Sequence, residues 1–188
     1  MTASTTADET LIARIAHHDR QAFEELVHRY EDSLAGYALA LSGRTDVVED
    51  ALQDAFVAVW NNAERFRGEA SGRAWIYAVT RNALRRQFRK RAGEPKQLCD
   101  IDELGRAAGW GRLADGGFAS RVESRLDLEA AFRELSDADR EVLYLTDIEG
   151  LTHAEAGQLL AATPSAVKTR VHRARLRLMA VLRGGDNE

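Results

Sequence analysis

Cysteine and proline are scarce in this sequence, with one and two copies among 188 residues. The single thiol, Cys99, cannot form an internal disulfide, and no Cys or His spacing resembles a zinc site. The adjacent His17 and His18 would point about 100° apart on a helix, which makes them a poor ligand pair. We therefore expect no metal and no cofactor, and the lack of disulfides favours a reducing cytosol.

Long apolar runs are also missing. No stretch is long enough to span a bilayer, and the N-terminus lacks the apolar core of a signal peptide. These absences predict a cytoplasmic protein without membrane insertion. Paired carboxylates, a nucleophile–base constellation and a phosphate-binding loop are likewise not apparent, so the sequence does not indicate an enzyme.

The composition of the sequence is typical of a helical protein. Hydrophobic residues make up 45% of the chain, helix formers dominate and strand-like alternation is rare, which predicts an all-α protein. The net charge of -4 does not suggest a nucleic-acid binder. Charge is unevenly spread, however: residues 81–91 and 168–183 are strongly basic, whereas 46–54 and 100–103 are acidic. Local patches therefore say more about partners than the total does.

Helical periodicity begins at Asp8. Asp19 is the predicted cap of a second helix that ends near Ser42, and Thr45 or Asp46 opens a third that extends to about Phe66. The third helix is apolar on one side and acidic on the other, and acidic first turns suit the helix dipole. Such an acidic stripe is either a solvated face or a docking surface for a basic partner.

The next helix is predicted from Ala74 to about Arg91, after a loop over 67–73 in which Ser71 is a candidate cap. It combines early aromatics, Trp75 and Tyr77, with a dense basic tail. This combination suits opened or single-stranded DNA, because bases stack on aromatic rings while cations hold the backbone. The alternative is that Trp75 belongs to the core and the tail is a solvated helix end.

Glycines and Pro95 interrupt the periodicity over 93–120, which predicts a flexible acidic linker. Beyond it we expect a helix over about 123–134 and another over 136–149, capped by Ser136 and ended by Gly150. A short helix follows, and Thr152 with Glu155 forms its capping box.

The last helix begins at Pro164 after the candidate cap Thr163. A short helix, a tight turn and a longer basic helix are the layout of a helix-turn-helix, whose second helix enters the major groove. The alternative is a solvated basic terminal helix. Four apolar residues share one side of this helix at helical spacing and are expected to pack inward: Val167, Val171, Ala174 and Leu178.

Three motifs in this order resemble the small extracytoplasmic-function (ECF) group of bacterial sigma-70 RNA polymerase sigma factors. Residues 46–60 are similar to region 2.2 of that family, and residues 74–82 with their basic tail to regions 2.3 and 2.4. Residues 135–143, 149–152 and 167–175 are similar to region 4. The resemblance covers nearly the whole chain, from about Leu11 to Leu182.

This resemblance implies two small helical domains, region 2 over 8–92 and region 4 over 121–184, joined by a linker over 93–120. It implies a factor that binds core RNA polymerase and directs it to −10 and −35 promoter elements. The implied partners are the β′ coiled coil and β flap of core polymerase, promoter DNA and an anti-sigma factor, which offers a route to tethering at a membrane. The acidic linker would thread the RNA exit region.

The resemblance also assigns binding residues by position, and no catalytic ones. Those facing core polymerase would be Glu49, Asp50, Gln53, Asp54 and Trp60. Those reading and opening the −10 element would be Arg73, Trp75, Tyr77, Arg81, Asn82 and Arg85. Those reading the −35 element would be Ser165, Lys168, Thr169, His172, Arg173 and Arg175.

Two stretches depart from the family pattern. Gly72-Arg73 stands where many members carry a Phe, so the loop that selects the −10 base is expected to differ. Ala156, Gly157, Ala161 and Ala162 replace the Ile, Ala, Gly and Ile often found in the helix-turn-helix. Less apolar volume and a mid-helix glycine predict a C-terminal domain of low intrinsic stability, which partners would help to order.

Two other functions remain as alternatives. A helix-turn-helix regulator that works without polymerase would leave the acidic stripe and the aromatic-basic helix without a role. A decoy that only sequesters an anti-sigma factor is disfavoured, because the chain retains residues that the resemblance assigns to DNA reading: Trp75, Arg81, Asn82, Lys168 and Arg173.

Overall fold

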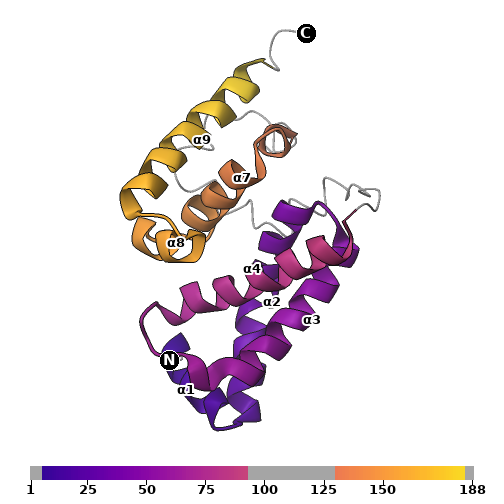
Figure 1. Ribbon diagram of the computed structural model, residues 1–188, viewed down its shortest axis with the longest axis vertical. Helices are drawn as coiled ribbons and strands as arrows, with labels where there is room; N and C mark the ends of the chain where they lie inside the picture. The colour runs from indigo at the N-terminus through magenta and orange to yellow at the C-terminus, as the bar shows by residue number, and fades with distance from the viewer. Residues whose placement is uncertain (1–5, 93–129, 185–188) are drawn as a thin grey trace, which may run out of the picture.

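The computed structural model describes residues 6–92 and 130–184, and these ranges contain helices and no strand. The helices form two groups, one at each end of the molecule (Figure 1). The predicted all-α class with two helical domains is therefore confirmed. The predicted linker, Cys99 and most of the helix expected near 123–134 lie outside the described residues.

The helix bounds follow the chain in order. The N-terminal group consists of α1 (Asp8–Ala16), α2 (Arg20–Ser42), α3 (Thr45–Asn62), the 3₁₀ turn η1 (Ala63–Arg65) and α4 (Gly72–Lys90). The C-terminal group consists of helical residues 130–133, α7 (Asp137–Leu143), the π turn η4 (Tyr144–Ile148), α8 (His153–Leu160) and α9 (Pro164–Gly184). No helix within the described ranges is both long enough and apolar enough to cross a membrane.

The predicted helix caps are present. The Asp19 carboxylate accepts hydrogen bonds from the first backbone amides of α2, and the Ser71 hydroxyl accepts one from the Ala74 amide. Thr152 and Glu155 form the full capping box of α8. The amide of Ala166 donates to the Thr163 hydroxyl at 3.2 Å. Each cap satisfies an otherwise orphan amide, which is why these residues fix where the helices start.

Three predicted boundaries are wrong, each for a local reason. The third helix stops at Asn62, whose side-chain amide donates to the carbonyl of Ala58 at 2.8 Å, instead of continuing to Phe66. The fourth starts at Gly72 rather than Ala74, because its N-cap is Ser71; the Gly72 amide also donates to the Glu9 carboxylate at 2.7 Å and so holds the start of the helix on α1.

The third difference lies in the expected helix over 136–149. The α-helix ends at Leu143, and the chain widens into the π turn. There the Thr146 hydroxyl donates to the Val142 carbonyl at 2.9 Å, a side-chain bond that competes with the regular helical ladder. Gly150 ends the segment with φ +68°, as expected of a terminating glycine.

One hydrophobic cluster runs through both groups. The inward positions predicted on α9, Val167, Val171, Ala174 and Leu178, are all buried. Three tyrosine rings link the groups: Tyr37 packs on Tyr77 with ring centroids 5.3 Å apart and on Tyr144 at 5.7 Å. The two groups therefore meet through a shared core and are not held by the chain alone.

The turn between α8 and α9 explains the glycine at 157, but it leaves Ala161 in a backbone conformation that glycine adopts more readily. A Cβ on Gly157 would lie 2.6 Å from the carbonyl oxygen of Ala162, so a glycine is needed where the chain doubles back. Ala161 ends α8 in the left-handed region, at φ 54°. That conformation costs an L-residue with a Cβ roughly 1 kcal/mol, a cost that glycine avoids.

We therefore predict that Ala161→Gly raises the free energy of unfolding by about 1 kcal/mol. Ala180→Gly is the matched control: it makes the same chemical change at an exposed position inside α9 and should lower that free energy by about 0.5 to 1 kcal/mol. Urea unfolding followed by circular dichroism measures both. A shift of the same sign in both variants would contradict the assignment of strain to Ala161.

Candidate polymerase and promoter interfaces

The acidic side of α3 is partly exposed and partly engaged. Glu49 and Gln53 are exposed and make no side-chain hydrogen bond or ion pair with the other described residues. Asp50 and Asp54 are half-buried: Asp50 pairs with Arg91 at 2.5 Å, and Asp54 accepts a 3.0 Å hydrogen bond from the buried amide of Gln87. The predicted stripe is thus a contact between α3 and α4 along one edge and a free surface along the other.

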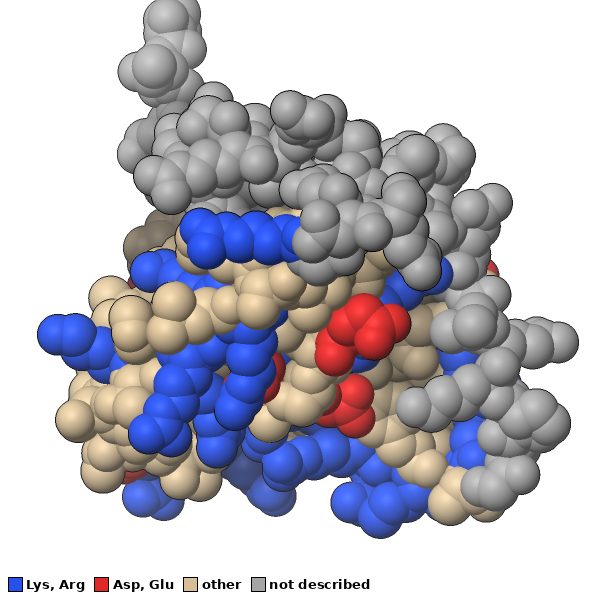
Figure 2. Space-filling model, turned by 90° about the horizontal axis from the view of Figure 1, so that it is seen from above, with Lys and Arg blue, Asp and Glu red and all other residues tan. Residues whose placement is uncertain are grey.

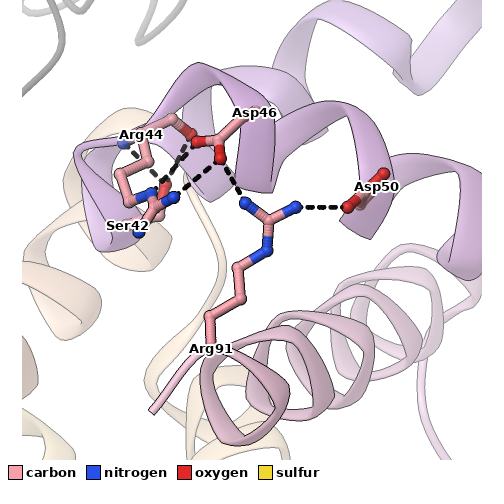
Figure 3. A network of polar contacts seen from close by, with 5 residues as sticks. All are labelled: Ser42, Arg44, Asp46, Asp50 and Arg91. Carbon is pink, nitrogen blue, oxygen red and sulfur yellow. Dashed lines mark hydrogen bonds and ion pairs between the residues drawn. The ribbon is translucent and has the colours of Figure 1, made fainter. Parts of the chain in front are cut away.

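The ion-pair network at the start of α3 is shown in Figure 3. The Arg91 guanidinium reaches from the end of α4 between Asp46 and Asp50, and Arg44 bonds Asp46 at 3.0 and 2.7 Å. The hydrogen bonds from Arg44, with those from Arg91, hold the pKa of Asp46 well below its usual range. The bond to Asp50 is the main cause of a raised pKa at Arg91. This network fixes the basic tail of α4 against α3.

A groove lies between α3 and α4, and one of its lining residues, Val57, has an exposed apolar side chain. Its lining residues are Asp50, Gln53, Asp54, Val57, Ala58, Asn61, Asn62, Arg86, Gln87, Lys90 and Arg91. Val57 is 54% exposed and Phe88 41% exposed. The sequence motifs assigned no role to either residue, because only the packing of the helices shows which apolar side chains stay exposed.

The ring of Trp60 packs against neighbouring aromatic rings and is also partly exposed. Its ring meets Phe23 edge-on with centroids 5.1 Å apart and lies 5.8 Å from the ring of His18. It is only half-buried, so one part of the ring remains accessible. Among the described residues, no three His, Cys, Asp or Glu side chains are grouped to hold a metal ion.

The residues predicted to read the −10 element are divided between two environments. Asn82 and Arg85 are exposed, and Trp75 is half-buried against Phe66 with ring centroids 5.5 Å apart. Tyr77 is fully buried in the tyrosine contact between the two helical groups. The sequence left open whether Trp75 is a core residue or is available to DNA bases. The structure shows a ring that packs partly on Phe66 and remains partly exposed to solvent.

The two arginines of this set bond acidic residues of the C-terminal group. Arg81 binds both oxygens of Glu141, at 2.6 and 3.0 Å, and Arg73 binds Glu149 at 2.9 Å. The hydrogen bond to Glu141 is the main cause of a raised pKa at Arg81. Burial, together with the nearby charge of Glu149, raises the pKa of Tyr77 far above its usual range.

The predicted −35 residues lie mostly on the outer side of α9. Ser165, Lys168, Thr169, His172 and Arg173 are all exposed. The side chains of Lys168, His172 and Arg173 bond to no other described residue. Figure 2 views the molecule from the end at which the C-terminal group lies, and it shows Lys and Arg side chains over the left and lower parts of that face and Asp and Glu in smaller patches near its centre.

Arg175 differs from its neighbours on α9. Its guanidinium binds both oxygens of Asp147 in the π turn, at 2.9 and 2.8 Å. The hydrogen bond to Asp147 is the main cause of its raised pKa. Arg175 therefore aims α9 relative to the π turn, a role that its position in the sequence motif did not indicate.

Comparison with known proteins agrees with this two-part arrangement. The family model for sigma-70 region 2 matches residues 26–94, and the model for sigma-70 region 4 matches residues 125–178. The RNA polymerase sigma factor CnrH of Cupriavidus metallidurans is 33% identical over 181 residues, covering 94% of this chain and 94% of that protein. The ECF RNA polymerase sigma factor EcfG of Rhodopseudomonas palustris is 28% identical over 159 residues, covering 80% and 79%.

A solved structure of CnrH in complex with the cytosolic domain of CnrY aligns with a TM-score of 0.70 and 28% identity, covering 95% of this chain and 99% of that one. An all-helical chain with a region 2 followed by a region 4 defines a promoter-specificity subunit of the transcription machinery. This chain belongs to the sigma-70 family of RNA polymerase sigma factors, in its ECF group.

The Arg175–Asp147 pair can be measured directly. In a double-mutant cycle of Arg175→Ala and Asp147→Ala, we predict a coupling of about 0.5 to 1 kcal/mol in the free energy of unfolding, because the pair is two-pronged but half-exposed. The cycle of Arg173→Ala with Asp147→Ala is the control and should give a coupling near zero. If both cycles gave the same coupling in the free energy of unfolding, the proposed role of Arg175 in positioning α9 would be contradicted.

Proposed function

We propose that this protein binds core RNA polymerase through α3 and directs it to promoters, reading the −10 element with α4 and the −35 element with α9. The observation that carries the proposal is the pairing of a region 2 and a region 4 in one chain, each with an exposed functional side. It acts by binding and not by catalysis. The proposed domain limits are 8–92 and 121–184.

Core polymerase would meet the exposed edge of α3. Glu49 and Gln53 are free to pair with a basic partner, whereas Asp50 is already paired with Arg91 and Asp54 accepts a hydrogen bond from Gln87. The exposed side of Val57 and the accessible part of Trp60 supply apolar area beside these charges. Charges at the rim with apolar groups between them are the usual composition of a specific interface. The partner surface would be the β′ coiled coil, with the β flap receiving the C-terminal group.

Promoter opening would use α4. Asn82 and Arg85 face solvent and can take DNA phosphates or base edges as the structure stands. A base flipped from the stack needs a pocket with an aromatic wall, which Trp75 and Tyr77 can line once they are accessible. Arg73 and Arg81 would hold the backbone of the opened strand, because guanidinium groups fit phosphates in a two-pronged geometry.

The −35 element would be read by α9 in the major groove. Lys168 and Arg173 have no competing partner among the described residues, and Ser165, Thr169 and His172 add short polar groups on the same exposed surface. The long side chains of Lys and Arg reach phosphates and the edges of guanine bases, whereas the short hydroxyl side chains of Ser and Thr contact base edges only where the helix lies close to the DNA. Arg175 would contribute by holding α9 in position.

A protein partner that inhibits the factor is also proposed. The aligned structure of CnrH contains the cytosolic domain of CnrY, and a second aligned structure, of RpoE from Bartonella quintana, contains the anti-sigma factor NepR. We propose that this chain likewise binds an anti-sigma factor in the cytoplasm, with membrane tethering if that partner is anchored. Size-exclusion chromatography with the product of a neighbouring gene tests this pairing.

Run-off transcription with core polymerase on a promoter library tests the main function. The wild-type factor should start transcripts at defined sites, and Lys168→Ala with Arg173→Ala should lower their yield at least about tenfold, through lost base and phosphate contacts. Arg183→Ala, an exposed change at the end of α9, is the control and should leave the yield unchanged. DNA binding without any polymerase-dependent transcript would favour the independent regulator, and neither activity would favour the decoy.

The polymerase surface has its own test. Glu49→Lys should weaken binding to core polymerase at least about tenfold, because it places a like charge against a basic partner. Glu64→Lys, the same change at an exposed residue of η1, should bind as the wild type does. Fluorescence titration of labelled factor with core polymerase measures both. Unaltered binding by the Glu49 variant would exclude this edge of α3 as the docking surface.

A further inference from the structure

The start of α4 is held by a side chain that lies 63 positions earlier in the chain. The Glu9 carboxylate of α1 accepts a hydrogen bond from the buried amide of Gly72 at 2.7 Å. The first amides of a helix have no partner within that helix, and a negative charge beside them is favourable. The Ser71 hydroxyl accepts from a second such amide, that of Ala74. Glu9 is therefore a second cap of α4, and it is supplied by another helix.

The backbones of α1 and α4 approach each other closely at this contact. A Cβ on Gly72 would lie 2.8 Å from the Cβ of Asp8 and 3.1 Å from the backbone nitrogen of Glu9. It would also lie 3.1 Å from Cδ1 of Ile12, a residue that is fully buried. A larger residue at this position would push the start of α4 away from α1. The departure from the family pattern at Gly72 is therefore matched by its neighbours on α1.

The position of α1 is itself fixed by α2 and the core. Arg29 of α2 donates to the Asp8 carboxylate at 2.7 Å and to the Thr6 carbonyl at 2.6 Å. The Tyr30 hydroxyl donates to the same carboxylate. Three apolar side chains of α1 are fully buried: Leu11, Ile12 and Ile15. Glu9 is thus presented to Gly72 from a helix that is anchored on both sides.

Helix α1 contacts both ends of the loop that joins η1 to α4. It packs on η1 as well as on α4, and Figure 1 shows the loop before α4 running beside the start of α1. The Phe66 amide donates to the Ala63 carbonyl of η1 at 3.1 Å. The Trp75 amide donates to the Ser71 carbonyl at 3.0 Å. The rings of Phe66 and Trp75 therefore come from opposite ends of the loop, and the place at which α1 holds those ends sets how the rings meet.

We propose that Glu9 is a positioning residue for promoter reading, which fixes the start of α4 against α1 and thereby sets which unpaired base the Phe66–Trp75 surface accepts. This inference rests on the proposed function of α4 at the −10 element. A flipped base is recognised in a closely fitting pocket, so a small displacement of one aromatic wall changes which base fits. Glu9 acts through the Gly72 amide and does not itself contact DNA.

Base preference at the −10 element separates a positioning role from a purely structural one. Full-length factor with core polymerase transcribes a promoter library randomised at the −10 and −35 elements, and transcripts are counted by template sequence. Glu9→Ala removes the acceptor of the buried Gly72 amide and should lower the preference for the best −10 base at least about threefold at one or more positions. Preferences at the −35 element should not change. A variant that was merely less stable would give fewer transcripts with unchanged preferences at both elements.

Three further variants test whether the hydrogen bond is the cause. Glu9→Gln keeps an oxygen that can accept from the Gly72 amide and should retain the wild-type preference. Gly72→Ala disturbs the same contact from the other side and should lower the preference as Glu9→Ala does. Glu24→Ala is the matched control: it removes an exposed carboxylate of α2 that pairs with the exposed Arg20, and it should match the wild type.

The outcomes distinguish this inference from the proposed function. If the wild type shows a −10 preference and Glu9→Ala keeps it, the inference is overturned and the proposed function stands. Equal losses of preference in Glu9→Ala and Glu9→Gln, or in Glu9→Ala and Glu24→Ala, would also overturn it, because the acceptor of the Gly72 amide would then not be the cause. A wild-type factor without any −10 preference would overturn the proposed function, and this inference with it.

Discussion

The pairing of arginines on α4 with glutamates from α7 and the end of the π turn controls how the rest of the molecule is arranged. Arg81 and Glu141 bind through two hydrogen bonds, and Arg73 and Glu149 bind where the carboxylate is almost fully buried. Charges placed away from water must be matched, since an unpartnered one is costly. The two helical groups are therefore held in one relative position. Helix α4 packs on α2 and α3 in the N-terminal group and also contacts α8 of the C-terminal group.

The same principle operates on the other side of α4. Its basic tail ends in Arg91, which is bound by Asp46 and Asp50 of α3. The acidic stripe is thus neither wholly solvated nor wholly a docking surface: its inner edge neutralises the tail of the neighbouring helix, and only its outer edge, at Glu49 and Gln53, remains for a partner. Because Asp46 and Asp50 tie α3 to Arg91, the exposed side chains of Glu49 and Gln53 on the same helix are held in a defined orientation.

The segment 144–149 joins the two functions of the C-terminal half. Tyr144 and Glu149 face the N-terminal group, through the ring of Tyr37 and the guanidinium of Arg73, while Asp147 holds Arg175 of α9. An α-helix would distribute these side chains differently, and the π turn permits all three contacts within six residues. The segment therefore connects the contact between the two helical groups with the residue that positions α9.

The sequence determined most of the helices, their caps and the family, because capping side chains, helical periodicity and terminating glycines act within a few residues. It also placed Lys168, His172 and Arg173 on the exposed side of α9. The tertiary structure alone decided the fate of Arg73, Tyr77, Arg81 and Arg175, since their partners are 28 to 76 residues away or come from the other helical group. It also decided the π turn and the tight approach at Gly157. Local rules fix where a side chain points from its own helix, and only packing between helices fixes what it meets there.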